Sequence, residues 1–152
     1  MIEVKKLYKG FEGNPILKGV SATFHPGKTS LIIGQSGSGK TVFLKSLIGL
    51  HTPDEGAIFF NGTLSSEFTE TEKQQWRQEI GMVFQGSALL DSQTVEDNVM
   101  FPLKMFTKQS DEAMLARVNF VLKRVNLENS NKKLPAELSG GMQKRVAIAR
   151  AI

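Results

Sequence analysis

Apolar and polar positions alternate at the start of the chain, a pattern typical of half-buried β-strands. Residues 2–8 alternate in this way, and residues 16–24 form a second strand-like run after a turn that contains glycine and proline. Residues 57–60 predict a further short strand, and Asn61-Gly62 predicts a hairpin turn after it. We therefore predict antiparallel β-structure for this part of the chain.

From residue 69 onward the apolar residues recur mainly at helical spacing. Thr69, Thr94 and Ser110 each precede such a segment and are good helix N-caps. Residues 80–84 predict one intervening strand, and a last helix begins just beyond Ser139. The clearest helical periodicity follows Ser110, with apolar residues at Met114, Leu115, Val118, Val121, Leu122 and Val125.

Residues 34–41 read Gly-Gln-Ser-Gly-Ser-Gly-Lys-Thr, which fits the phosphate-loop pattern G-x-x-x-x-G-K-[ST]. Residues 31–33 predict a buried strand before this phosphate loop, and residues 42–48 predict a helix after it. The glycines leave the backbone N–H groups of the loop accessible to a phosphate chain, and the helix directs its positive end at the same phosphates. We expect Lys40 to reach the β- and γ-phosphates and Thr41 to hold Mg²⁺. The predicted cofactor-binding residues of the loop are Gly34, Gln35, Ser36, Gly37, Ser38, Gly39, Lys40 and Thr41.

The phosphate-loop pattern also arises by accident in an occasional glycine-rich turn. The predicted strand before it and helix after it argue against an accident here. We therefore predict that the chain binds ATP with Mg²⁺. The loop alone does not identify the class of protein, because kinases and GTPases share it.

Composition removes several other classes. The chain has 152 residues, of which 40% are apolar and 22% charged, and a net charge of +4, as in ordinary globular proteins. The sequence has no basic tail and no patch of interleaved basic and aromatic residues, so we do not expect nucleic acid to be its main ligand. There is no cysteine, and we expect His25 and His51 to face solvent in loops. Because no apolar stretch reaches about 18 residues, we expect neither secretion nor a membrane span.

Four features together resemble one family, the ATP-binding subunits of ABC transporters. They are the phosphate loop, a Q-loop-like Met82-Val83-Phe84-Gln85, a signature-like Leu138-Ser139-Gly140-Gly141-Met142-Gln143-Lys144-Arg145, and Phe11. Met142 stands where most members carry glutamine. Phe11 matches the aromatic residue that stacks on adenine; Tyr8 is a second candidate, and core packing is the alternative role of Phe11. The resemblance runs from residue 2 to residue 152.

The resemblance implies an α/β fold. Its parts are a P-loop (RecA-like) core, an N-terminal antiparallel β subdomain and a helical subdomain. Residues 1–86 would form the β subdomain and core, residues 87–138 the helical subdomain, and residues 139–152 the signature motif and its helix.

The same resemblance implies roles for individual residues. Lys40 and Gln85 take the catalytic positions, and Thr41 and Gln85 the Mg²⁺ positions. Gln85 ends the predicted strand, so its amide can contact Mg²⁺ or the attacking water. The signature residues form a helix N-terminus that binds the γ-phosphate held by the other subunit's loop; these are Ser139, Gly140 and Gly141. Two ATP molecules are then sandwiched in a two-fold homodimer, which ATP binding closes and hydrolysis opens.

A narrower resemblance, over residues 85–92, 95–99 and 140–146, points to the ATPases of Mla-type phospholipid transporters. It implies permease subunits in the membrane, a lipid-binding partner, no nucleic acid, and a peripheral place on the cytoplasmic face of the cell (inner) membrane. The alternative is a soluble ABC-type ATPase of regulation, repair or translation. One apolar cluster favours core packing over a groove for a membrane partner: Met100, Phe101, Met105 and Phe106.

The resemblance also implies a second acidic strand, which carries an Mg²⁺-ordering Asp and the catalytic Glu, and a switch histidine beyond Ile152. We therefore expect a chain cut short before that strand, with exposed apolar surface and unpaired strand edges. Without the general base, we expect weak nucleotide binding and negligible hydrolysis from these 152 residues, and ATPase activity from the full-length parent.

Overall fold

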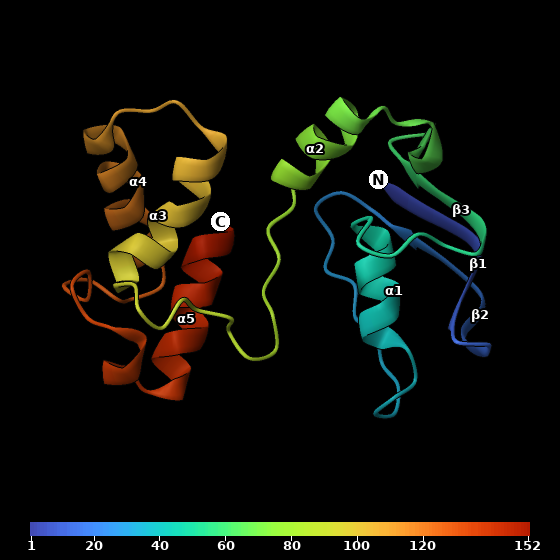
Figure 1. Cartoon of the computed structure of the whole chain (residues 1–152), viewed down its shortest axis with the longest axis horizontal. Helices are drawn as coiled ribbons and strands as arrows, with labels where there is room; N and C mark the ends of the chain where they lie inside the picture. Colours follow the sequence, from blue (N-terminus) through green and yellow to red (C-terminus); the bar gives the residue numbers. More distant parts are fainter. The chain divides into compact units, whose positions relative to one another are not determined.

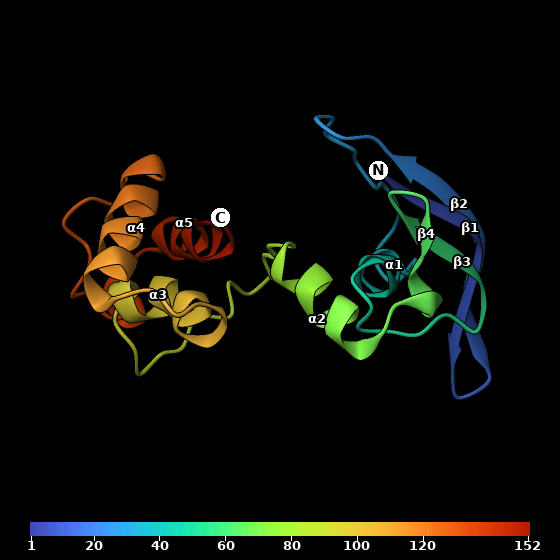
Figure 2. The same ribbon diagram turned by 90° about the horizontal axis from the view of Figure 1, so that it is seen from above.

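A four-stranded antiparallel sheet and a cluster of three helices dominate the computed structural model, which describes residues 1–152 (Figures 1 and 2). The sheet belongs to a first unit, Met1–Glu79, and the helix cluster to a second unit, Ile80–Ile152. Each unit has its own hydrophobic core.

The sheet of the first unit has the order β2-β1-β3-β4, with every neighbouring pair antiparallel. Its strands are β1 (Ile2–Phe11), β2 (Asn14–Phe24), β3 (Glu55–Phe60) and β4 (Thr63–Leu64). Asn61 and Gly62 both have positive φ between β3 and β4, as a two-residue hairpin turn requires. The predicted antiparallel β-structure and this hairpin turn are therefore confirmed.

Helix α1 (Lys40–Leu47) covers one face of this sheet (Figure 2). It buries Phe43 and Leu47 against apolar side chains of the strands, among them Val4 and Leu7 of β1, between which the strand register shifts. The core of the first unit consists of Val4, Leu7, Leu17, Phe43, Leu47 and Ile58. Because α1 begins at Lys40, the packing of this core fixes the place of the phosphate loop.

Helix α2 (Glu70–Gln78) follows a short 3-10 turn, η1 (Ser65–Glu67), and is tied to the sheet. A capping box closes its start, with Thr69 N–H donating to the Glu72 carboxylate at 2.8 Å, which confirms the cap predicted at Thr69. Trp76 stacks on Phe60 of β3, with ring centroids 4.3 Å apart. Arg77 donates to the Gly49 carbonyl at 3.2 Å.

The second unit packs α3 (Val95–Phe106), α4 (Asp111–Arg124) and α5 (Gly140–Ala151) around one core, with η2 (Pro135–Glu137) before α5 (Figure 1). Thr94, Ser110 and Ser139 cap the three helices, as predicted. Hydrogen bonds from Asn131 and Lys132 lower the pKa of Glu96 in the first turn of α3. None of the helices of the chain is long and apolar enough to cross a membrane.

Two predicted strands are not formed. Residues 31–33 and 80–84 carry no strand, and neither segment makes a backbone hydrogen bond to another strand. Leu31 and Ile33 are 82% and 84% exposed, so the prediction of a buried strand is wrong for them. A β-strand exists only with a hydrogen-bonded neighbour, and the sheet of the first unit stops at β2 and β4. The apolar exposure that we expected is present at these two residues.

The assignment of the Met–Phe cluster on α3 to the core is largely wrong. Met100 is buried, but Phe101, Met105 and Phe106 are exposed. The core of the second unit takes one stripe of α3, and these three side chains lie outside it. The proposed boundaries at residues 86 and 138 remain predictions about subdomains; the compact units divide at Glu79.

A pair of leucine variants tests how buried and exposed apolar positions differ in their contribution to stability. We expect Leu7→Ala to lower the free energy of unfolding of the first unit by about 2–5 kcal/mol, because Leu7 is fully buried. Leu31→Ala should change it by less than about 0.5 kcal/mol, because that side chain contacts solvent. Urea unfolding followed by circular dichroism measures both; an equal loss would contradict the described packing.

Candidate functional site

The phosphate loop leads directly into α1, is separated from the end of β2 by residues 25–33, and is exposed to solvent along most of its length. It closes on itself through one turn hydrogen bond, in which Ser38 N–H donates to the Gln35 carbonyl at 3.2 Å. Gly37 and Gly39 have φ values of 80° and 90°, which L side chains rarely adopt. The glycines predicted from the motif therefore serve the backbone path of the loop.

Gly39 has a second role, because it is buried against β2. A Cβ at this position would lie 2.8 Å from the Ile16 side chain and 3.1 Å from that of Leu17. A Cβ at Gly37 would meet nothing within 4 Å. The junction between loop and helix is thus pressed onto the sheet at Gly39, while the loop tip stays open.

Lys40 points back over the loop that precedes it. Its Nζ donates to the carbonyl oxygens of Gly34 and Gln35, both at 2.7 Å. It forms no salt bridge with a carboxylate. The ammonium group therefore lies at the mouth of the loop with neutral partners, where a phosphate oxygen could replace a carbonyl.

The first turns of α1 and α5 lack the acidic residues found in the other helices. Each of α2, α3 and α4 carries two acidic residues there, but α1 and α5 carry none. The first N–H groups of any α-helix have no partner within the helix, and they attract negative charge. Both predicted phosphate-binding positions therefore keep their positive helix ends without an internal counter-charge.

Thr41 lies in the open first turn of α1, with its side chain exposed. Its hydroxyl forms no hydrogen bond with another residue. No group of three or more His, Cys, Asp or Glu side chains in the chain could hold a metal. This donor set fits Mg²⁺ only if nucleotide phosphates and water supply most of the ligands, as is usual for that ion.

The two aromatic candidates for adenine stacking lie on β1 and are both 41% exposed, so the core role for Phe11 is wrong. Tyr8 extends over Gly19 of β2, where a Cβ added to Gly19 would lie 2.8 Å from the Tyr8 hydroxyl.

Phe11 makes an edge contact with the His51 ring, with 5.2 Å between ring centroids, so His51 is half-buried rather than solvent-facing. The Lys9 ammonium lies 5.4 Å from the Phe11 ring centroid. Its hydrogen bond to Asp54 lowers the pKa of that carboxyl.

Gln85 is exposed and lies in a turn of the second unit rather than at the end of a strand. The backbone then passes through Ser87 and Ala88, both at positive φ, before it reaches α3. Arg150 of α5 donates to the carbonyls of both residues. The predicted position of Gln85 on a strand is therefore wrong, and its role remains a prediction.

Ser139 caps α5, and its Oγ accepts from Met142 N–H at 3.3 Å. Gly140 and Gly141 occupy the first helical positions, are exposed, and would meet nothing within 4 Å if they carried a Cβ. Glycine in a helix costs about 1 kcal/mol relative to alanine. No contact within the chain requires glycine at these two positions.

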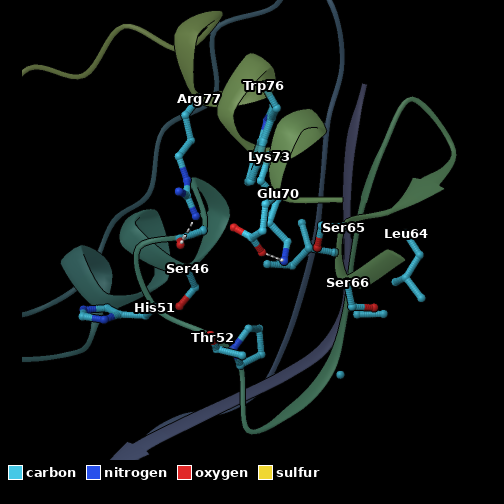
Figure 3. Close-up of a pocket in the computed structure, with 15 residues that line it drawn as sticks. Ser46, His51, Thr52, Leu64, Ser65, Ser66, Glu70, Lys73, Trp76 and Arg77 are labelled. Carbon is cyan, nitrogen blue, oxygen red and sulfur yellow. Dashed lines mark hydrogen bonds and ion pairs between the residues drawn. The ribbon is translucent and has the colours of Figure 1, made fainter. Parts of the chain in front are cut away.

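A pocket of about 490 Å³ lies between α1, α2 and the β3–β4 hairpin of the first unit (Figure 3). Glu70 and Lys73 form an ion pair at 2.7 Å within its lining, and Arg77 and Trp76 face it from the same helix. The Trp76 indole N–H is buried without a hydrogen-bond partner. None of the predicted site residues lines this pocket.

Sequence reasoning missed two residues that shape the neighbourhood of Gln85. Arg150 and Asn98 each hold backbone carbonyls of the segment 87–94. The available signal is a polar side chain in an otherwise apolar helical stripe: Asn98 is fully buried and stands beside Val99, and Arg150 follows buried Ala149. That signal does not identify the backbone carbonyls that each side chain contacts.

These features define a class of protein. The family model for ABC transporters matches residues 17–152, and the chain belongs to that family. Its fold is that of the ABC ATPase cassettes. The whole chain superposes with a TM-score of 0.89 and 32% identity on 69% of an ATP-binding cassette solved as a dimer with ADP and Pi in a post-hydrolysis state. It also matches 60% of cbiO1 from Clostridium perfringens, part of an ABC transporter complex, at 29% identity, with a TM-score of 0.86 over 99% of the chain.

Curated relatives carry several functional names. A probable ribonucleotide transport ATP-binding protein of Mycobacterium leprae is 42% identical over 99% of the chain and 44% of its own length. A protein of Arabidopsis thaliana named TRIGALACTOSYLDIACYLGLYCEROL 3, chloroplastic, is 40% identical over the whole chain and 44% of its own length. A methionine import ATP-binding protein of Clostridium tetani is 39% identical over the whole chain and 48% of its own length. The chain thus spans less than half the length of these relatives.

Two glycine variants separate backbone strain from packing in the loop. Gly37→Ala should cost about 1–2 kcal/mol of unfolding free energy, since only the left-handed conformation opposes it. Gly39→Ala should cost about 1–3 kcal/mol more, because the new Cβ also presses on Ile16 and Leu17. Thermal and urea unfolding measure both, and equal costs would show that Gly39 does not hold the loop against β2.

Proposed function

We propose that this chain is the ATP-binding part of an ABC transporter subunit, which couples ATP binding and hydrolysis to transport across a membrane. The observation that carries the proposal is the folded phosphate loop, with Lys40 seated at its mouth and a helix start that lacks counter-charge. Membership of the ABC transporter family supports it.

In this proposal the loop residues bind and orient the triphosphate. Lys40 exchanges its two carbonyl partners for phosphate oxygens, and the N–H groups of the loop and of the first turn of α1 surround the same phosphates. Thr41 contributes its exposed hydroxyl to Mg²⁺, which neutralises charge on the β- and γ-phosphates when bound. Gln85 orients the attacking water, and Phe11 offers its exposed ring to adenine.

The second half of each nucleotide site comes from another copy of the chain. Gly140 and Gly141 leave the start of α5 open to an incoming anion, and their lack of side chains permits close approach. An isologous two-fold dimer would place this helix end against the phosphate held by the partner's loop. The cassette solved with ADP and Pi is itself a dimer, which supports this arrangement.

The partner in the membrane is a permease subunit. Phe101, Met105 and Phe106 form an exposed apolar strip on α3, shortly after the Gln85 turn, and such strips commonly mark protein interfaces. We assign this strip to a permease segment on the cytoplasmic face of the cell membrane. The whole protein would therefore be peripheral at that membrane.

Replacement of the loop lysine tests the proposed function. In the intact protein as its gene encodes it, Lys40→Ala should weaken Mg-ATP binding by about a hundredfold, which corresponds to ~2.7 kcal/mol, and reduce hydrolysis to background. Lys45→Ala, in the last turn of the same helix, is the matched control and should change either quantity by less than about twofold. Calorimetric binding and phosphate release are the measurements. Hydrolysis that persists in Lys40→Ala would contradict the proposed function.

Phospholipid is the substrate class that we propose for the intact transporter. The resemblance of residues 85–92, 95–99 and 140–146 to Mla-type ATPases supports it. A relative whose name contains a galactolipid supports a lipid substrate in general. Other relatives are named for ribonucleotide and methionine transport. These names supply the competing substrates for a test.

A transport assay with the intact complex in liposomes decides between these substrates. Labelled phospholipid, methionine and a ribonucleotide are supplied in parallel, with a Lys40→Ala complex as the control. We expect ATP-dependent movement of phospholipid alone, because the narrower resemblance is to lipid transporters. Movement of methionine or ribonucleotide instead would contradict the substrate class, and purification without any membrane subunit would favour a soluble ATPase.

A further inference from the structure

The segment that follows Gln85 is fastened to α5 by a single side chain. Arg150 donates from Nη1 to the Ala88 carbonyl at 2.7 Å and from Nη2 to the Ser87 carbonyl at 2.9 Å. A planar guanidinium fork fits two adjacent acceptors at once, which an ammonium group does not. Partial burial lowers the pKa of Arg150, whose side chain is half-buried.

The backbone held by Arg150 is in an unfavourable conformation. Ser87 and Ala88 have φ values of 62° and 47°, a region that residues with a Cβ rarely occupy, and still more rarely in succession. Ser87 is buried, while Ala88 is exposed. Such a conformation persists only where the surroundings impose it. Two hydrogen bonds lie within the turn itself, from Ser87 N–H to the Phe84 carbonyl at 3.0 Å and from Ala88 N–H to the Gly86 carbonyl at 2.7 Å. The two hydrogen bonds from Arg150 hold the same residues from another element.

The far end of the same segment is fastened to α3. Asn98 is fully buried, and its Nδ2 donates to the carbonyls of Leu90, Gln93 and Thr94 at 3.0–3.1 Å. Its Oδ1 accepts from Leu90 N–H at 2.7 Å. Residues 87–94 are therefore fixed to the helices of the second unit at both ends, and Gln85 stands two residues before the Arg150 contact.

We propose that Arg150 is a positioning residue, which locks the turn after Gln85 to α5 so that Gln85 and the Ser139–Gly141 end of that helix move as one body. The inference rests on the proposed function of these two positions. Helix α5 has 12 residues and is about 18 Å long, so it can transmit a displacement from its open N-terminus to the Arg150 contact. The clamp would tie the placement of the water-orienting amide to the contact with the partner's nucleotide.

The test compares two arginines of α5 in the intact protein. Arg150→Met removes the clamp but keeps a long apolar stem, and Arg150→Lys keeps the charge without the fork. The matched control is Arg145→Met, because Arg145 likewise donates to two carbonyls, those of Val125 and Asn126 at 3.1 and 2.9 Å, at the end of α4. Two double variants add Ala88→Gly to Arg150→Met and to Arg150→Lys, since glycine adopts the same backbone without strain.

We expect Arg150→Met to lower kcat about tenfold, with the Kd for a non-hydrolysable ATP analogue changed by less than about twofold. Arg150→Lys should fall between this variant and the wild type. Ala88→Gly should raise kcat of either Arg150 variant by about threefold, because the turn no longer needs the clamp to hold it. Hydrogen exchange at the amides of residues 86–90 should accelerate in Arg150→Met and not in Arg145→Met.

The outcomes separate this proposal from the proposed function. If the wild type shows no Lys40-dependent hydrolysis, the proposed function fails. If hydrolysis is present but Arg150→Met and Arg145→Met lower kcat equally, Arg150 has only a structural role and the clamp is overturned. If Arg150→Met does not fold, Arg150→Lys carries the comparison, and the absence of rescue by Ala88→Gly overturns the clamp.

Discussion

The open first turns of α1 and α5 are the constraint on which the rest of the account depends. The start of a helix leaves N–H groups unpaired. In α2, α3 and α4, acidic residues and capping side chains lie beside these groups. The first turns of α1 and α5 carry no acidic residue; Gly39 precedes α1 without a side-chain cap, and Ser139 caps α5 just before Gly140 and Gly141. The positive ends of these two helices therefore have no acidic counter-charge in their first turns, and each helix packs in the core of its own unit.

Backbone in the left-handed region occurs both in the phosphate loop and in the turn after Gln85. The loop before α1 needs two residues at positive φ and the close fit of Gly39 on β2. The turn after Gln85 needs two more such residues and the fork of Arg150. Strained backbone of this kind tends to gather at functional positions, where other contacts hold it. The antiparallel sheet and the helix cluster supply those contacts.

The sequence predicts the elements whose causes are local. Alternation gave β1, β2 and β3, side-chain caps gave the helix starts at Thr69, Thr94, Ser110 and Ser139, and the glycine pattern gave the phosphate loop. Residues 31–33 and 80–84 are apolar enough for strands, but a strand also needs a neighbour, which no local pattern supplies. The contact of Arg150 with Ala88 joins residues 62 positions apart, so periodicity could not predict it.

A mixed dimer tests the central claim, that an open loop in one copy faces an open helix end in another. One copy carries Lys40→Ala, and the other carries Gly141→Asp, which adds to α5 the first-turn acidic residue that α2, α3 and α4 already have. Each homodimer then lacks an intact sandwich, while the mixed dimer has one. We predict one trapped molecule of a non-hydrolysable ATP analogue per mixed dimer and none in either homodimer. Trapping by the Gly141→Asp homodimer, or none by the mixed dimer, would contradict the account.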